Sequence, residues 1–215
     1  MNLTALAIRI CAVEAIAGAT IAEDRVFDSR FEEMDSVAAS TKLPVISVYT
    51  DDDRLTAEGG TSLARAVLVG KRELKLAVDM GVASIITIPL PNGESVEEIG
   101  FPETDSNHEA LLNVMGHQVF AALFAASGPW ADLFRSFVTN VGAIDSVRGA
   151  DVKNGTRFAA RSIVLTLDTI ADPPFGVAMP AGTPWATFLA KAKDTPRFAN
   201  IAALVEAEIS GTVPT

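Results

Sequence analysis

The sequence predicts an α/β fold of the α+β kind: a twisted, mainly antiparallel sheet of long strands packed by helices. Three observations lead to this prediction. In the stretch 155–172, apolar and polar residues alternate from Ile163 to Asp168, as in a strand with one buried face. A second alternating stretch covers 72–83, and residues 106–126 have the periodicity of an amphipathic helix.

The two alternating stretches are predicted to pair with each other. The strand at 155–172 spans about 15 residues where about 5–6 is typical, so it needs a partner of similar length. The stretch 72–83 provides one, and a slip of one residue there would turn all its apolar side chains to water. Asp172 and two prolines end the long strand, because proline cannot donate to a strand ladder.

The N-terminal stretch 2–17 is predicted to be a helix that is apolar on most of its circumference. Such a helix must be covered on two sides, either by its own fold or by a neighbouring subunit. The charged stretch 23–35 follows as an extended connection docked by its aromatic residues, and 43–50 as a β-branched strand. Residues 51–53, three aspartates in a row, are interpreted as a helix cap or solvated turn, with a cation site as the alternative.

The rest of the chain completes a sheet with helices on it. The main helix begins with a capping box, Ser106 to Glu109, and ends at Gly128-Pro129. Asn154-Gly155 is a two-residue turn that predicts a hairpin. The other predicted elements are a projecting loop at 55–70, an apolar run at 85–90, an acidic loop at 94–103, a helix at 130–138, a weaker strand at 143–152, and helices at 185–193 and 197–209.

Composition limits the classes of function. A chain of 215 residues fits one domain or one domain with an appendage, here divided into 1–175 and a helical extension at 176–215. The net charge of −10 argues against general affinity for nucleic-acid phosphates. The single cysteine, Cys11, excludes an intramolecular disulfide and is expected in the core. No apolar run approaches about 18 residues, so we expect a soluble protein made in the cytoplasm, without a membrane span.

No catalytic signature is present in the sequence. Nucleotide-binding glycine loops, a nucleophile elbow and zinc-ligand spacings are missing. The only histidines, His108 and His117, are nine residues apart on one predicted helix and point in opposed directions. We therefore expect no metal and no cofactor, and a structural or assembly role in place of an enzyme. The distant alternative is a hydrolase of unrecognised type.

Several segments together resemble the tail terminator and minor tail proteins of long-tailed phages and gene-transfer particles, the class of the phage lambda U protein. They are, after the N-terminal helix, DRVFDSR at 24–30, LPVISVYTDDD at 43–53, SGPWADLF at 127–134 and GTRFAARSIVLTLDTIADP at 155–173. The resemblance covers roughly residues 1–175, and the C-terminal extension has no counterpart in it.

The resemblance implies a virion protein that forms a ring, usually a hexamer. Such a ring caps the tail tube, stops polymerisation of the tail tube protein and provides a surface for the head–tail connector, while DNA passes through its lumen without specific binding. It implies a place in the tail or neck of the virion, and in the host cytoplasm during assembly. A ring of six copies would carry 6 × −10 = −60 charges. Other neck or head–tail joining proteins and tail tube proteins are the nearer alternatives.

Charged residues in two of the resembling segments are candidates for contacts between subunits, because oppositely charged loops can pair across a repeated interface. A solvated surface is the alternative interpretation of the same residues. The candidates are Arg25, Asp28, Arg30, Asp51, Asp52, Asp53 and Arg54.

Overall fold

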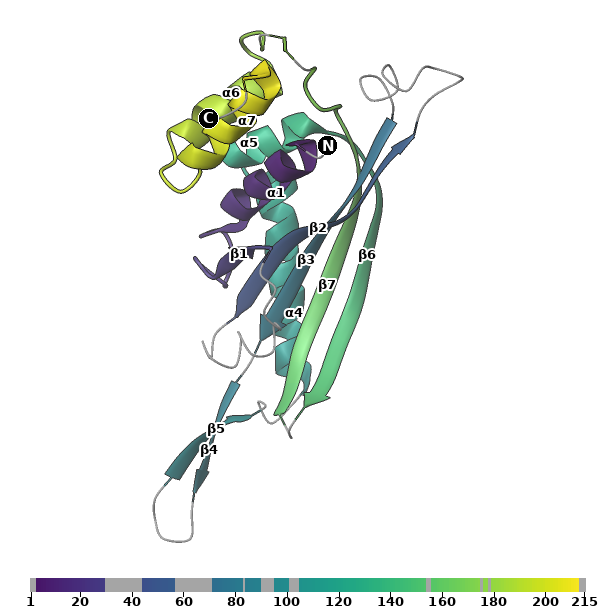
Figure 1. Cartoon of the computed structure of the whole chain (residues 1–215). Helices are drawn as coiled ribbons and strands as arrows, with labels where there is room; N and C mark the ends of the chain where they lie inside the picture. The colour runs from purple at the N-terminus through teal and green to yellow at the C-terminus, as the bar shows by residue number, and fades with distance from the viewer. Residues whose placement is uncertain are drawn as a thin grey trace.

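The protein has two layers, a five-stranded sheet and a group of helices on one side of it (Figure 1). This is the predicted fold class. The computed structural model describes residues 3–29, 44–56, 71–82, 84–89, 95–100, 105–153, 156–174, 176–177 and 179–212.

The sheet has the strand order β1-β2-β3-β7-β6. All neighbouring pairs are antiparallel except β1 with β2. The predicted pairing of the two alternating stretches is confirmed, since β3 and β7 lie side by side with Leu76 opposite Leu165. The strands are β1 (Val26–Asp28), β2 (Val45–Thr56), β3 (Lys71–Val82), β6 (Val138–Lys153) and β7 (Thr156–Thr169).

The predicted helices are present close to their expected bounds. They are α1 (Leu3–Ile16), α4 (Asp105–Phe120), α5 (Pro129–Phe137), α6 (Pro184–Lys193) and α7 (Ala199–Ser210). A π-helical turn, η1 (Ala121–Ala125), extends α4. Two further strands, β4 (Ser84–Pro89) and β5 (Ser95–Gly100), form a separate two-stranded sheet that projects from the body (Figure 1).

The core lies between the helices and one face of the sheet. Leu74, Leu76, Val78 and Met80 of β3 are fully buried there. At Gly116, α4 comes so close to the sheet that an added Cβ would lie 3.4 Å from Ile163 Cδ1. The helix α1 is covered within its own fold, because it contacts α5 on one side and β1 and β2 on another.

The C-terminal helices belong to the same hydrophobic core. The ring of Phe137 at the end of α5 makes edge-to-face contacts with Trp185 and Phe188 of α6, with centroids 5.1 and 6.0 Å apart. Trp130 makes a similar contact with Phe198 at 6.1 Å.

The structure corrects three local predictions. Residues 51–53 are part of strand β2, because they continue its pairing with β3 past a bulge between Thr50 and Asp52; they form neither a turn nor a cap. The acidic stretch 94–103 contains strand β5 in place of a loop. Strand β6 starts at Val138, well before 143, and register shifts at 138/140 and 141/143 disturb its alternation in the sequence.

Some predictions fall outside the described residues. These are the hairpin turn at 154–155, residues 30–35 of the connection at 23–35 and residues 57–70 of the loop at 55–70, although the β6–β7 hairpin itself is confirmed.

Candidate subunit interface

The second face of the sheet carries mainly polar and small side chains, with Tyr49, Val147 and Val164 among them. None of the described helices contacts it, since their contacts are with the face that bears the core (Figure 1). From the register, five carboxylates and two cations share this face with small residues. The charged residues are Asp52, Arg54, Glu73, Lys75, Asp79, Asp145 and Asp168.

Both sides of the sheet have backbone without a partner among the described strands. β6 pairs only with β7 and is the outer strand along its whole length. On the opposite side, β1 covers only the positions 46–48 of β2, so that the second half of β2 is also an outer strand. Free N–H and C=O groups along such an edge can pair with a strand of another chain.

Four of the seven charged candidates make contacts inside the subunit, and three of them do so through hydrogen bonds. Arg25 donates to Pro44 O at 2.9 Å and to Glu23, and so fastens the turn before β1 to the start of β2. Asp28 forms an ion pair with Arg9 of α1 at 2.5 Å. These interactions stabilise the subunit, and a role in subunit contacts remains a prediction for both residues. Arg30 lies outside the described residues.

Asp53, the third, belongs to a buried ion network centred on Arg72. The Arg72 guanidinium contacts Asp53 through Nε at 2.9 Å and through a second nitrogen at 2.5 Å. Its remaining nitrogen contacts Asp172 at 2.7 Å. Asp172 also accepts hydrogen bonds from the Thr4 backbone N–H and hydroxyl, at 2.8 and 2.7 Å, in the first turn of α1. The network therefore joins β2, β3, the segment after β7 and α1.

Burial lowers the pKa of Arg72, but its hydrogen bonds to Asp53 and Asp172 and their charges more than reverse this, and the net shift is upward. The side chain is only 6% exposed. The guanidinium is thus a permanent cation that two carboxylates must neutralise. Sequence inspection missed this network because its members are far apart in the chain.

The remaining candidates, Asp51, Asp52 and Arg54, are exposed on the outer half of β2. Asp52 lies 3.4 Å from Lys75 of β3 in a solvent-exposed pair. Asp51 and Arg54 make no ion pair within the described residues. Of the six predicted positions that the structure describes, these three are the ones on the outer half of β2 that are exposed.

None of the seven residues predicted for subunit contacts lies on β6. Ile144 and Val147 are 51% and 58% exposed, which is unusual for large apolar side chains on an outer strand. Asp145, which lies between these two residues in the sequence, and Arg148, which follows Val147, are also exposed. The predicted strand at 143–152 was the available signal, but the sequence alone did not show that this strand would be at an edge.

Tyr49, the only tyrosine, lies on the polar face and donates to Asp79 Oδ2 at 3.0 Å. Burial, the charge of Asp79 and its hydrogen bond, and the charge of Asp51 raise the pKa of Tyr49 to about 12. Since the folded pKa exceeds the ordinary value of about 10, the contribution of this group to stability is complete below about pH 10 and is lost as pH rises toward 12.

We therefore expect a single tyrosinate transition near pH 12 in an ultraviolet titration of the folded protein. Asp79→Asn should lower that midpoint only part of the way toward 10, because burial is the largest cause of the shift. A wild-type midpoint near 10 would contradict the placement of Tyr49.

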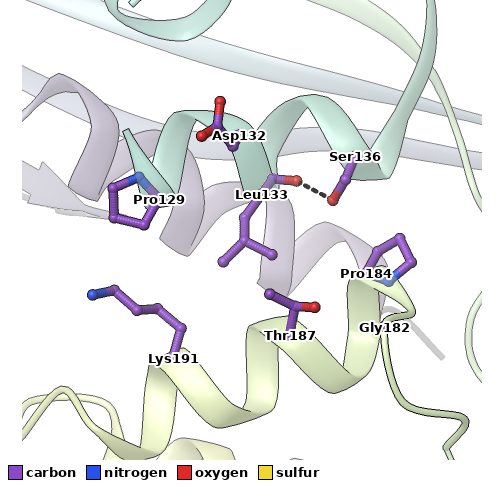
Figure 2. Close-up of a pocket in the computed structure, with 8 residues that line it drawn as sticks. All are labelled: Pro129, Asp132, Leu133, Ser136, Gly182, Pro184, Thr187 and Lys191. Carbon is purple, nitrogen blue, oxygen red and sulfur yellow. Dashed lines mark hydrogen bonds between the residues drawn. The ribbon is translucent and has the colours of Figure 1, made fainter. Parts of the chain in front are cut away.

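A groove of about 410 Å³ lies between the antiparallel helices α5 and α6 (Figure 2). Leu133 and Thr187 face each other across it, and Lys191 and Pro184 mark its ends. The Ser136 hydroxyl donates to Leu133 O at 2.7 Å, and Asp132, which lines the same groove, forms an ion pair with Arg135. The side chains that line this groove are better suited to apolar contacts than to catalysis.

The described residues contain no cluster of three or more potential metal-binding side chains. Burial, followed by the charge of Glu14, raises the pKa of the Cys11 thiol well above its usual range, which makes it a poor nucleophile. No single described helix is long and apolar enough to cross a membrane. One bent pair, Glu109–Ala125 with Pro129–Phe137 at 77°, meets the length and composition criteria, and its apolar side is in the core.

No known protein-family model matches the chain. A search of curated proteins likewise finds no match. The candidate interface therefore has to be interpreted from its own geometry.

Proposed function

We propose that this chain is a structural virion protein that forms a closed ring at the head-proximal end of a phage tail. In this role the ring ends polymerisation of the tail tube and provides the surface to which the head joins. The observation that carries the proposal is the mainly antiparallel sheet, which among the described residues has helices on one face only and a strand without a partner at each side. The resemblance of the sequence to tail terminators agrees with it.

Repetition of such a subunit around an axis would join the sheets into a continuous wall. A head-to-tail contact closes into a ring when its rotation divides the circle, and closure leaves no strand edge free. The polar face, with five carboxylates and two cations, would then line the lumen. A lumen of this charge repels phosphates, so that DNA slides through and is not held.

The first test is the mass of the purified protein in solution, measured by light scattering after size exclusion and accompanied by negative-stain images. A ring of six copies has a mass of about 136 kDa, six times 22.6 kDa. One closed ring of defined size is the expected result, either alone or after addition of purified tail tubes, whose ends it should cap. Tubes of indefinite length would instead indicate a tail tube protein. A monomer that does not bind tubes would contradict the proposal.

A further inference from the structure

The two edges of the sheet that have no partner among the described strands carry charged and apolar residues in complementary order. On the outer half of β2 the exposed residues include Asp51, Arg54 and Leu55, the last of them 42% exposed. On β6, Ile144, Asp145 and Arg148 are exposed. Each edge thus carries an acidic, a basic and an aliphatic residue. Each of these has a residue of opposite charge, or a second aliphatic residue, on the other edge.

We propose that β6 of one copy pairs antiparallel with the outer half of β2 of the next copy, in the register that places Ile144 opposite Leu55. This inference rests on the proposed ring and names the contact that closes it. The strand directions allow it, because β2 and β6 run in opposite directions within the sheet. Adding β6 beside β2 therefore continues the antiparallel alternation from copy to copy.

In this register the opposed residues match in charge and in polarity. Arg54 lies opposite Asp145, both on the polar face, as their partners Glu73 and Val164 show. Leu55 and Ile144 both lie on the helix-bearing face and cover each other's exposed surface. Opposed pairs of this kind each stabilise a sheet by roughly 0.2–1 kcal/mol.

Asp51, at the bulge of β2, reaches the level of Arg148 in the same register. The Arg148 side chain is 60% exposed, and its ion pair with Glu109 is long, with 3.7 Å between Nε and Oε2. Arg148 is therefore available for the contact with Asp51. Asp51, Arg54 and Asp145 make no ion pair within the described part of the chain. The contact therefore forms new charge pairs without breaking a buried one.

The neighbouring registers are worse. A slip of two residues in one direction places Asp52 opposite Asp145, which brings like charges together. A slip of two in the other direction places Arg54 opposite Val147. A slip of one residue turns the helices of successive copies to opposite faces of the sheet, which a closed ring does not allow.

A cysteine pair tests the register directly. In the variant Leu55→Cys/Ile144→Cys the two thiols of neighbouring copies face each other at a distance that permits a disulfide. Mild oxidation at high protein concentration should give a ladder of linked chains on a non-reducing gel. The control Leu55→Cys/Val147→Cys places its thiols on opposite faces and should cross-link at least tenfold more slowly. Native Cys11 is buried and does not interfere.

A charge exchange provides an independent measurement. Arg54→Asp should weaken association between copies about tenfold, because it places two carboxylates opposite each other. Arg54→Asp/Asp145→Arg should restore it, whereas Glu208→Arg, an exposed change on α7, should have no effect.

The outcomes distinguish the contact from the function. If the protein forms a ring in light scattering but the matched cysteine pair links no faster than its control, the β6–β2 contact is overturned and the ring stands. If no ring forms, alone or on tail tubes, the proposed function fails. Rapid linking of the matched pair would support the contact in either case.

Discussion

Replacing Arg72 with methionine is expected to lower the free energy of unfolding by about 3–5 kcal/mol. Methionine keeps most of the side-chain volume but removes the charge that holds Asp53 and Asp172 together. These carboxylates are 16% and 9% exposed, so they would remain poorly solvated and without their cation. Urea denaturation followed by far-ultraviolet circular dichroism measures the change.

Lys75→Met is the matched control for this experiment. Lys75 is on the same strand, β3, and also pairs with an aspartate of β2, but both side chains of that pair are largely exposed. Solvent-exposed ion pairs contribute about 0–1 kcal/mol. If Arg72→Met costs no more than Lys75→Met, the Arg72 network does not stabilise the fold as described.

Phe137→Ala is expected to cost about 3–5 kcal/mol as well, the range for removing a buried aromatic side chain. Phe137 is fully buried and its ring packs against Trp185 and Phe188, so the substitution leaves a cavity between α5 and α6. We expect unfolding to remain a single transition, because residues on both sides of position 175 share one core.

The control for Phe137 is Leu204→Ala on α7, where the side chain is 57% exposed and the expected change is within about 0.5 kcal/mol. Tryptophan fluorescence and circular dichroism should give the same midpoint for each variant. A separate early transition of the C-terminal helices would contradict a single cooperative unit and would favour an independent extension after 175.

Much of the fold could be predicted from local patterns. The alternation in 72–83 identified β3 together with its buried face, because a strand with one solvated side must alternate. The long strand at 155–172 and its pairing with β3 followed from the same rule and from strand length. The helix bounds near Gly128-Pro129 followed from the conformational limits of those residues.

Where the pattern was weak or misleading, the prediction failed. The three aspartates at 51–53 looked like a solvated turn, yet they extend β2, since pairing with β3 outweighs their low strand propensity. The two bulges of β6 shifted its alternation, which hid the first part of the strand.

The sequence by itself determined most of the elements and the buried faces of β3, β7 and α4, because those properties depend on the periodicity of neighbouring residues. Only the tertiary structure decided what the charged candidates do. Asp53 is held by Arg72, while Asp51 and Arg54 remain exposed on an outer strand. That difference depends on which strand lies at the edge of the sheet and on the contact of Arg72 with Asp172, a residue distant in sequence. Such relations arise from packing and leave no local signal.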